Sequence, residues 1–373
     1  MPKTKQILTK AELKMLTYIF LFQPIDKSLL RLVGNNYDFA GRIVKSLLSK
    51  RYIEESFISA DYNKKEPVVQ TTKQGDEIFL YYFPLPVSLI EQNRNKIKGD
   101  ENKYRQYKLS SVILMFSQIC PEYCQQFVTL EKSLQYNSDV LYQALELRGN
   151  KFPFIITNRE FRDMDDYNLR KITATRSNGV AVTEKEVFTL YNHNRKKMRS
   201  HGDFEDKFKL YIETVFPNKN QSAIHFGKSY KVASDTILKT SFQKKSSFIL
   251  SNDLYHHNYY VPLTVPGARQ LEIYFIKNSR EKIKTEILTS DEISAARNTI
   301  YDGEAGDRII YLGFHCDISE IERLFYLLET VKQGSLLDIY CFDHQRLFYE
   351  NLFENKAHII PLSISDIFSV IKK

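Results

Sequence analysis

Two acidic and histidine pairs stand where strands of the C-terminal third are expected to end. His315-Cys316-Asp317 follows the apolar run Arg308–Phe314, and Asp343-His344 follows the next expected strand. Ligands of open parallel sheets bind beyond the carboxyl ends of the strands, so both pairs could line one crevice. The alternative is structural, with Asp317 capping the helix that follows it. The sequence around these pairs has no phosphate-binding or dinucleotide-binding glycine pattern, and we expect no cofactor.

A second histidine pair, His256-His257, lies beside Tyr259-Tyr260. In a relaxase or a replication initiator, histidines hold a metal ion and a tyrosine attacks a phosphodiester. Adjacent residues of a strand point to opposite faces, so neighbouring histidines cannot both face one ion. The chain has 24 tyrosines, which makes a Tyr-Tyr pair common by chance. We therefore predict no catalytic residue in this segment.

A nuclease of the restriction-endonuclease type needs a metal-binding Asp on one strand and Glu-x-Lys on the next. Glu272-Ile273-Tyr274 and Asp338-Ile339-Tyr340 come near this pattern, but each has Tyr where Lys is required. Among the 4 cysteines, Cys120 and Cys124 form one close pair, whereas a zinc ribbon needs two. The sequence thus predicts no catalytic residues and no metal ligands, and a sheet that serves as a scaffold.

Composition places the chain among packed globular proteins. Its 373 residues are enough for about two domains, and 43% are hydrophobic against 26% charged. Subtracting 45 acidic from 53 basic residues gives a net charge of +8, which favours a polyanionic partner. No apolar run approaches the ~20 residues of a bilayer span, and the start does not read as a secretory signal. We expect a cytoplasmic protein with no membrane partner.

The first 80 or so residues carry the most informative pattern. Thr9 and Glu12 fit a capping box at the start of a helix over 10–22. Asp26 can cap a short second helix and Asp38 a third. A hairpin with a Lys-Lys tip follows, and a threonine then caps the next helix.

Three helices, a hairpin and a further helix in this order predict a winged helix-turn-helix domain over residues 1–82, which binds duplex DNA. The third helix would enter the major groove, and the hairpin tip would contact phosphate. The ordinary alternatives are a solvated basic helix face and a winged helix that binds protein. The residues expected to contact DNA are Arg42, Lys45, Ser46, Ser49, Lys50, Arg51, Lys64 and Lys65.

Residues 83–150 are predicted to form a basic connector and a helical segment. Residues 94–108 are rich in Lys and Arg and are expected to be exposed, either along a phosphate backbone or as a solvated linker. Apolar spacing predicts a helix from Tyr107 to about Phe127.

Residues 151–373 are predicted to form a mixed α/β domain. Alternation of strands and helices near the C-terminus predicts a parallel sheet. The expected strands are 154–157, 178–182, 186–191, 223–227, 247–250, 308–314, 336–342 and 358–362, and the expected helices are 203–215, 318–331, 345–353 and 365–371.

The winged start and two internal segments resemble the replication-relaxation group of plasmid and mobile-element proteins. The segments are Thr157–Phe161 with Arg176–Asn192, and Tyr260–Leu263, and the likeness runs loosely over residues 9–265. This resemblance implies an N-terminal winged helix and a C-terminal domain similar to the restriction-endonuclease-like fold. It also implies a role near plasmid replication or conjugative transfer.

The leading functional hypothesis is a sequence-specific double-stranded DNA-binding protein of a plasmid or mobile element. It would act as a transcription regulator or as an accessory factor in replication or transfer, and could bind as a homodimer to inverted half-sites. Two alternatives stay open, which are a metal-dependent nuclease or other nucleic-acid enzyme that uses the C-terminal sheet, and a protein-docking adaptor.

Overall fold

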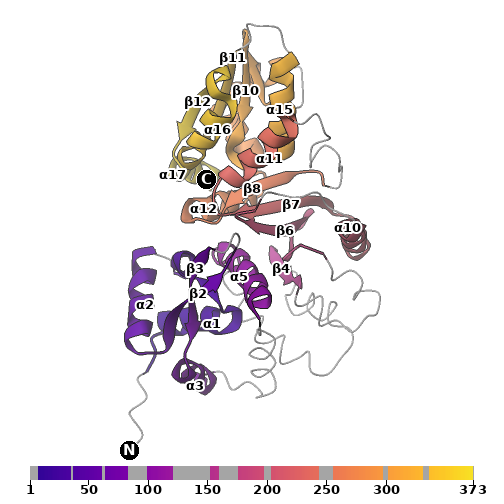
Figure 1. Ribbon diagram of the computed structural model, residues 1–373. Helices are drawn as coiled ribbons and strands as arrows, with labels where there is room; N and C mark the ends of the chain where they lie inside the picture. Colours follow the sequence, from indigo (N-terminus) through magenta and orange to yellow (C-terminus); the bar gives the residue numbers. More distant parts are fainter. Residues whose placement is uncertain are drawn as a thin grey trace, which may run out of the picture. The chain divides into compact units, whose positions relative to one another are not determined.

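A computed structural model gives the fold, a mixture of α-helices and three β-sheets of mixed topology (Figure 1). The chain divides into two compact units. The first comprises residues 1–173, 177–182 and 263–265, and the second comprises 174–176, 183–262 and 266–373. The structure describes residues 7–34, 37–60, 64–82, 99–120, 152–158, 175–196, 203–242, 255–296, 301–330 and 336–372.

Helix α1 (Lys10–Phe22) opens the first unit and begins at the predicted capping box. Thr9 Oγ1 accepts the N–H of Glu12 at 3.2 Å, and the Glu12 carboxylate accepts the N–H of Thr9 at 2.9 Å. The Glu12 side chain is only 6% exposed. A buried carboxylate needs further donors, and it has two. Lys50 Nζ lies 2.6 Å and Ser46 Oγ 2.7 Å from Glu12 Oε1.

The predicted short second helix is a 3-10 helix, η1 (Lys27–Val33). Its cap is as predicted, because Asp26 Oδ1 accepts the N–H of Ser28 at 2.9 Å. All four of its apolar residues, Leu29, Leu30, Leu32 and Val33, are buried. With three residues per turn, each of these side chains lies directly beside the one three positions away, which aligns the buried pairs.

Helix α2 (Tyr37–Ser49) follows. It begins one residue before Asp38, so the prediction that Asp38 caps it was wrong and Asp38 lies in the first turn. An acidic residue there still favours the helix, because the helix dipole is positive at that end.

A three-stranded sheet in the order β1-β3-β2 completes this part of the first unit. Its strands are β1 (Ile25–Asp26), β2 (Ile53–Ser59) and β3 (Lys65–Thr71), and β2 with β3 forms the predicted hairpin. Helix α3 (Lys73–Tyr82) starts at the predicted threonine, since Thr72 Oγ1 accepts the N–H of Gly75 at 3.1 Å. A Cβ at Gly75 would lie 1.8 Å from the carbonyl oxygen of Tyr52, so this position requires glycine.

Helix α5 (Asp100–Met115) covers the described part of the predicted basic connector, of which residues 99–103 and 105 are exposed, as predicted. The helix begins seven residues before the predicted Tyr107 start. Tyr107 is fully buried and donates from its hydroxyl to Asp26 Oδ2 at 2.8 Å, and Ser110 Oγ donates to the carbonyl of Pro24 at 2.9 Å. The helix is therefore part of the first unit. Residues 94–98 and 121–127 of these predictions lie outside the described residues.

Strands β4 (Phe154–Thr157) and β5 (Gly179–Val182) pair antiparallel in the first unit, and both were predicted. Gly179 has a positive φ of 135°, and a Cβ there would lie 2.2 Å from the carbonyl oxygen of Ile156. Glycine is required at this point of the strand pair.

The second unit opens with alternating strands and helices. Parallel strands β6, β7 and β8 lie side by side in that order, which the sequence did not predict. Helices α10 and α11 connect successive strands in the chain. The bounds are β6 (Glu186–Asn194), α10 (Asp203–Val215), β7 (Asn220–Gly227), α11 (Lys231–Phe242) and β8 (Asn258–Pro262). The predicted strand 247–250 lies outside the described residues.

A four-stranded sheet in the order β12-β11-β10-β9 forms the rest of the second unit. Strands β10, β11 and β12 are parallel, as predicted, and β9 is antiparallel to β10. The elements after β8 are α12 (Val265–Tyr274), α13 (Ser279–Ile287), α14 (Ser290–Ala295), β9 (Gly303–Ala305), β10 (Arg308–Leu312), η3 (Gly313–His315), α15 (Ile318–Thr330), β11 (Leu336–Phe342), η4 (Asp343–Gln345), α16 (Arg346–Phe353), η5 (Glu354–Lys356), β12 (Ala357–Leu362) and α17 (Ile364–Ile371).

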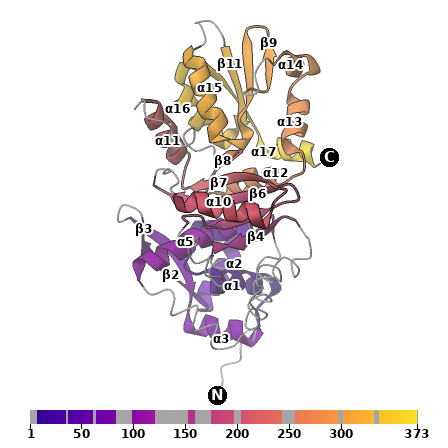
Figure 2. The ribbon, with the colours of Figure 1, turned by 90° about the vertical axis from the view of Figure 1, so that its right-hand side faces the viewer.

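Helices cover both faces of this sheet because successive strand residues point to opposite sides. Tyr311 packs with α11, α15 and α16, whereas Ile310 and Leu312 pack with α12, α13 and α17. Figure 2 shows α15 and α16 on one side of this sheet and α13 on the other. The predicted strand over 308–314 was two residues too long, since a 3-10 turn replaces it from Gly313.

No helix in the described part of the chain combines the length and the apolar character that a bilayer span requires.

Removing the charge of Glu12 should destabilise the first unit. Burial acts to raise the pKa of Glu12, but hydrogen bonds from Lys50, Ser46 and Thr9 outweigh it and lower the pKa from 4.5 to about 2. This stabilisation is complete above about pH 4.5 and is lost as the pH falls towards about 2. We expect Glu12→Gln to lower the free energy of unfolding by roughly 2 kcal/mol at pH 7, and by less at pH 3.

Urea unfolding at both pH values measures this difference. Glu77→Gln is the matched control, because Glu77 is an exposed residue of α3. Equal losses for the two variants at pH 7 would show that the Glu12 ion pair contributes no net stability.

Candidate functional site

The end of strand β10 turns sharply before helix α15, and this turn positions the candidate site. Gly313 touches the fully buried Tyr349, whose hydroxyl donates to the Gly313 carbonyl at 2.6 Å. A Cβ on Gly313 would lie 2.5 Å from that hydroxyl oxygen. Cys316 has a positive φ of 47°, a strained conformation for a residue with a side chain. This left-handed conformation turns the chain and places Asp317 beside β8.

Asp317 is fully buried and holds two segments of the second unit together. Its Oδ1 accepts the backbone N–H of Ser319 at 3.0 Å and that of Asn258 at 3.2 Å. Its Oδ2 lies 2.7 Å from His257 Nδ1. Asp317 therefore caps α15, as the structural alternative predicted, and also forms a dyad with a histidine.

A chain of hydrogen bonds leads from this carboxylate into the sheet. Asn258 Nδ2 donates to Ser319 Oγ at 2.9 Å, and Asn258 Oδ1 lies 3.1 Å from His225 Nε2. His225 Nδ1 lies 2.9 Å from His193 Nε2. Burial lowers the pKa of His225 from 6.5 to about 4, so this imidazole is neutral near pH 7.

An ion-pair network lies on the other side of Asp317. Arg280, on α13, donates through both terminal nitrogens to Glu320, at 2.8 and 3.0 Å. The same guanidinium lies 3.7 Å from Asp302. Asp302 is 4% exposed and also accepts the N–H of Leu312 at 2.8 Å.

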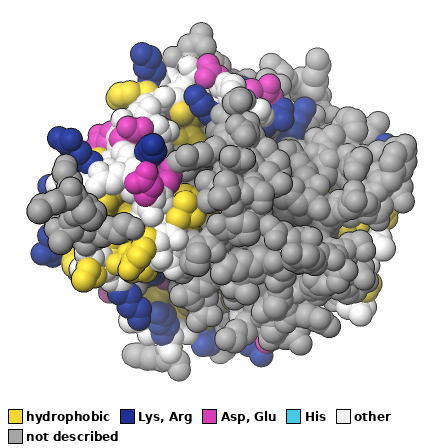
Figure 3. Space-filling view, turned by 90° about the horizontal axis from the view of Figure 1, so that it is seen from below, with side chains coloured by type: hydrophobic (Ala, Val, Ile, Leu, Met, Phe, Trp, Pro, Cys, Tyr) yellow, Lys and Arg dark blue, Asp and Glu magenta, His cyan; other side chains and the backbone are white. Residues whose placement is uncertain are grey.

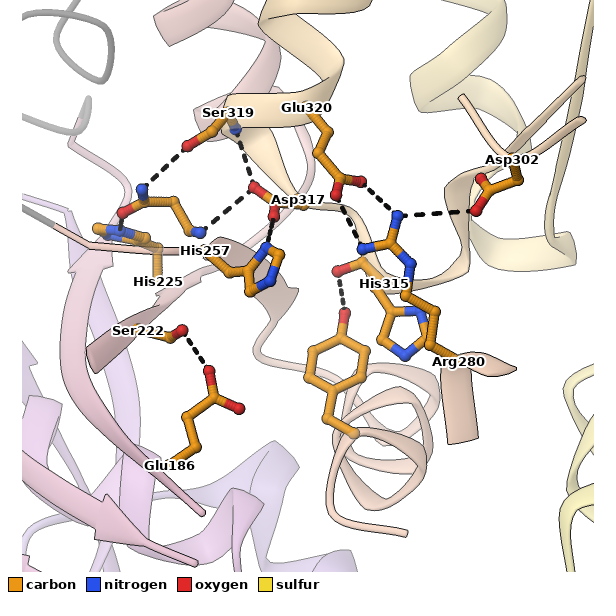
Figure 4. A network of polar contacts seen from close by, with 12 residues as sticks. Glu186, Ser222, His225, His257, Arg280, Asp302, His315, Asp317, Ser319 and Glu320 are labelled. Carbon is orange, nitrogen blue, oxygen red and sulfur yellow. Dashed lines mark hydrogen bonds and ion pairs between the residues drawn. The ribbon is translucent and has the colours of Figure 1, made fainter. Parts of the chain in front are cut away.

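A further carboxylate approaches from the parallel sheet. Glu186 accepts a hydrogen bond from Ser222 and interacts electrostatically with His257 and Asp317. Phe188 lies opposite Ser222 in the sheet register, and Ile224 lies opposite Tyr259. Residues two apart on a strand point to the same face, so Glu186 lies on the same face of the sheet as Ser222 and Tyr259. Figure 4 shows Glu186 and Ser222 on the strands beneath His257.

Burial, neighbouring charges and hydrogen bonds shift the pKa values of these side chains. Burial raises the pKa of Glu186 and of Asp302. Burial, together with the charge of Asp317, raises that of Glu320. Burial alone would lower the pKa of His257, but its hydrogen bond to Asp317 outweighs this effect and raises it.

Three of these side chains can converge on one cation. Ligand atoms of His257, Asp317 and Glu320 all lie within 4.8 Å of one another. The arrangement offers a proton-transfer dyad and a set of nitrogen and oxygen donors of the kind that divalent metals bind.

Most other predicted strand-end residues have structural partners. His315 is buried, and its carbonyl accepts the Tyr274 hydroxyl. Burial lowers the pKa of His315 to about 3. His344 lies 3.1 Å from Gln270 Oε1, and burial lowers its pKa to about 4. Asp343 is exposed.

Asp338 and Glu272, set aside as nuclease ligands, lie in ion pairs. Asp338 Oδ2 lies 3.0 Å from Arg308, and Glu272 lies 3.0 Å from Arg269. Glu272 also lies on helix α12, where the nuclease pattern needs a strand. Of the histidine pair, which lies just before β8, His256 is exposed and His257 contacts Asp317, so the two differ in environment.

The residues predicted to contact DNA divide into two groups. Arg42, Lys45 and Ser49 are exposed along α2. Ser46 and Lys50 instead donate to Glu12, with Lys50 only 21% exposed.

The remaining predicted contacts lie at the ends of the hairpin. Arg51 has a φ of 57° and lies in the turn between α2 and β2, and Lys64 and Lys65 are exposed beside the tip. Tip residues 61–63 lie outside the described residues. On the face in Figure 3, the described Lys and Arg side chains are scattered among hydrophobic and acidic ones.

No protein-family model, curated protein or solved structure matches this chain. The resemblance to the replication-relaxation group therefore stays a prediction.

The sequence reasoning missed Glu320, Arg280, Asp302, Asn258 and Glu186. One signal was available for Glu320, because Asp317-x-x-Glu320 has the spacing of a capping box and brings both carboxylates to one helix end. Arg280 and Asp302 carried no such local signal.

Replacing His225 should flatten the pH dependence of stability in the second unit. The unfolded chain takes up a proton at this residue near pH 6.5, whereas the folded chain does so only near 4. Stability is therefore lost as the pH falls from about 6.5 to about 4. His225→Gln should remove a slope of up to about 1.4 kcal/mol per pH unit from this window.

Thermal unfolding between pH 7 and pH 4.5 measures the slope. His256→Gln serves as the control, since His256 is an exposed histidine of the same unit. If His225→Gln and the unchanged protein keep the same slope, His225 is not held neutral.

Proposed function

We propose that the protein binds double-stranded DNA in a sequence-specific manner through a winged helix in its first unit. The order of elements carries this proposal. Helix α1, strand β1, helix η1, helix α2 and the hairpin β2–β3 follow one another, with β1 beside β3 in the sheet. This order and pairing support a winged helix-turn-helix, in which α2 would be the recognition helix and the hairpin the wing.

The outer surface of α2 suits a DNA groove. Arg42, Lys45 and Ser49 are spaced by three and four residues, which places them in one stripe along the helix. All three are exposed. Arg42 also lies over the ring of Phe39, at 5.7 Å, which limits its side-chain freedom before binding.

The contacts of Glu12 narrow the set of residues that we propose to contact DNA. Because Lys50 and Ser46 donate to this carboxylate, they hold α2 against α1. Base and phosphate contacts then fall to Arg42, Lys45 and Ser49 on the helix and to Lys64 and Lys65 at the wing.

A protein-docking role is the second candidate, and exposed aromatic side chains favour it. Phe57 on β2 is 65% exposed, and Phe39 on α2 is 46% exposed. Exposed Glu54 and Glu55 also lie on β2, where they would repel phosphate.

Selection from a pool of random duplexes, at two salt concentrations, tests the proposal. We expect enrichment of a short site, with an affinity that falls steeply as salt rises. Arg42→Glu with Lys45→Glu should weaken binding to that site by at least ~100-fold and reduce the salt slope by about two. These substitutions leave the Glu12 ion pair intact.

The matched control is Lys185→Glu with Lys277→Glu, which changes the same charge at exposed residues of the second unit. An equal loss in both double variants would mean that net charge alone governs binding. Absence of any enriched site would favour docking to a protein.

A further inference from the structure

We propose that His257, Asp317 and Glu320 form a binding site for one divalent transition-metal ion in the second unit. This inference is independent of DNA binding. The site requires an imidazole nitrogen and two carboxylate oxygens, which come from the start of β8 and the start of α15.

The ligand atoms lie near the required separation. All three are within 4.8 Å of one another, whereas an ion about 2.1 Å from each ligand needs them roughly 3 to 4 Å apart. Side-chain rotations would have to close this difference when an ion binds. The Asp317 carboxylate is already oriented, because the N–H groups of Ser319 and Asn258 hold its Oδ1. Its Oδ2 faces His257, and the metal would take the place of the proton between them (Figure 4).

The local charge favours an additional cation. Four carboxyl groups, those of Glu186, Asp302, Asp317 and Glu320, surround the guanidinium of Arg280 and the imidazole of His257. Asp317 and Asp302 are 0% and 4% exposed, so water screens them little. Buried carboxylates in excess of cations are costly unless they are protonated or bind a metal.

Arg280 competes with the metal in this arrangement. Its guanidinium occupies both oxygens of Glu320. The metal must take one of these oxygens, and Arg280 can keep the other while it moves towards Asp302, which lies 3.7 Å away. Neutralising Arg280 should therefore strengthen metal binding.

The donor set favours Zn²⁺ and Mn²⁺ over Mg²⁺. One imidazole with two carboxylates suits borderline ions, whereas Mg²⁺ prefers oxygen ligands and retains water. Three protein ligands also leave coordination positions open, as in metal sites that bind a water molecule or a substrate.

Titration of the full-length protein with Zn²⁺ in a calorimeter, and with Mn²⁺ by electron paramagnetic resonance, tests the proposal. We expect one saturable site, with Zn²⁺ tighter than Mn²⁺ and Mg²⁺ weakest. His257→Ala and Asp317→Asn should each weaken binding at least ~10-fold. Arg280→Gln should strengthen it several-fold.

His256→Ala is the matched control, because it removes the neighbouring exposed imidazole and should leave the affinity unchanged. Circular dichroism checks that each variant is folded. Should Asp317→Asn fail to fold, Glu320→Gln decides, since the hydrogen bonds of Glu320 in the described part of the chain come from Arg280 and Tyr311 and not from the backbone of β8.

Three results would overturn the proposal. The first is no saturable binding of either ion. The second is binding that neither His257→Ala nor Glu320→Gln weakens, and the third is binding that His256→Ala weakens as strongly as His257→Ala does.

Discussion

The buried carboxylate of Asp317 is the interaction on which the second unit depends. It lies where the four-stranded sheet gives way to α15, and it bonds to the beginning of β8 in the parallel sheet. Tyr260 N–H adds a backbone bond to the carbonyl of Cys316 at 2.9 Å. The Asp317 carboxylate and this backbone bond together join the two sheets, and the positive φ of Cys316 turns the chain so that Asp317 reaches β8.

Both units use the same solution for a buried acid. Glu12 in the first unit and Asp317 in the second each cap a helix and, at the same time, pair with a basic side chain from a distant segment. Each carboxylate thereby gains enough donors to remain charged in the interior. The hydrogen bonds to nearby backbone N–H groups fix where each helix starts. The ion pair with the distant side chain fixes how that helix packs against another segment.

Local signals in the sequence predicted much of the fold. The Thr9 and Glu12 capping box, the hairpin, the Thr72 cap and the parallel strands near the C-terminus all depend on residues close in sequence. The metal-ligand set could not be found in this way, because His257 and Asp317 are 60 residues apart. Arg280 and Glu320 are 40 apart. Helical periodicity likewise placed Lys50 outward, although its partner Glu12 lies 38 residues earlier on another helix.

The histidine chain in the parallel sheet has a fixed direction. Asn258 presents its carbonyl oxygen to His225 Nε2, so that nitrogen must carry the hydrogen. Neutral His225 then has a bare Nδ1, which can only accept, and His193 must donate through Nε2. In this arrangement every hydrogen points from His193 towards Ser319, and each imidazole carries a hydrogen on Nε2. The hydrogen bonds thus form a row in which every donor points the same way. The order of donors and acceptors in this row matters as much as their number.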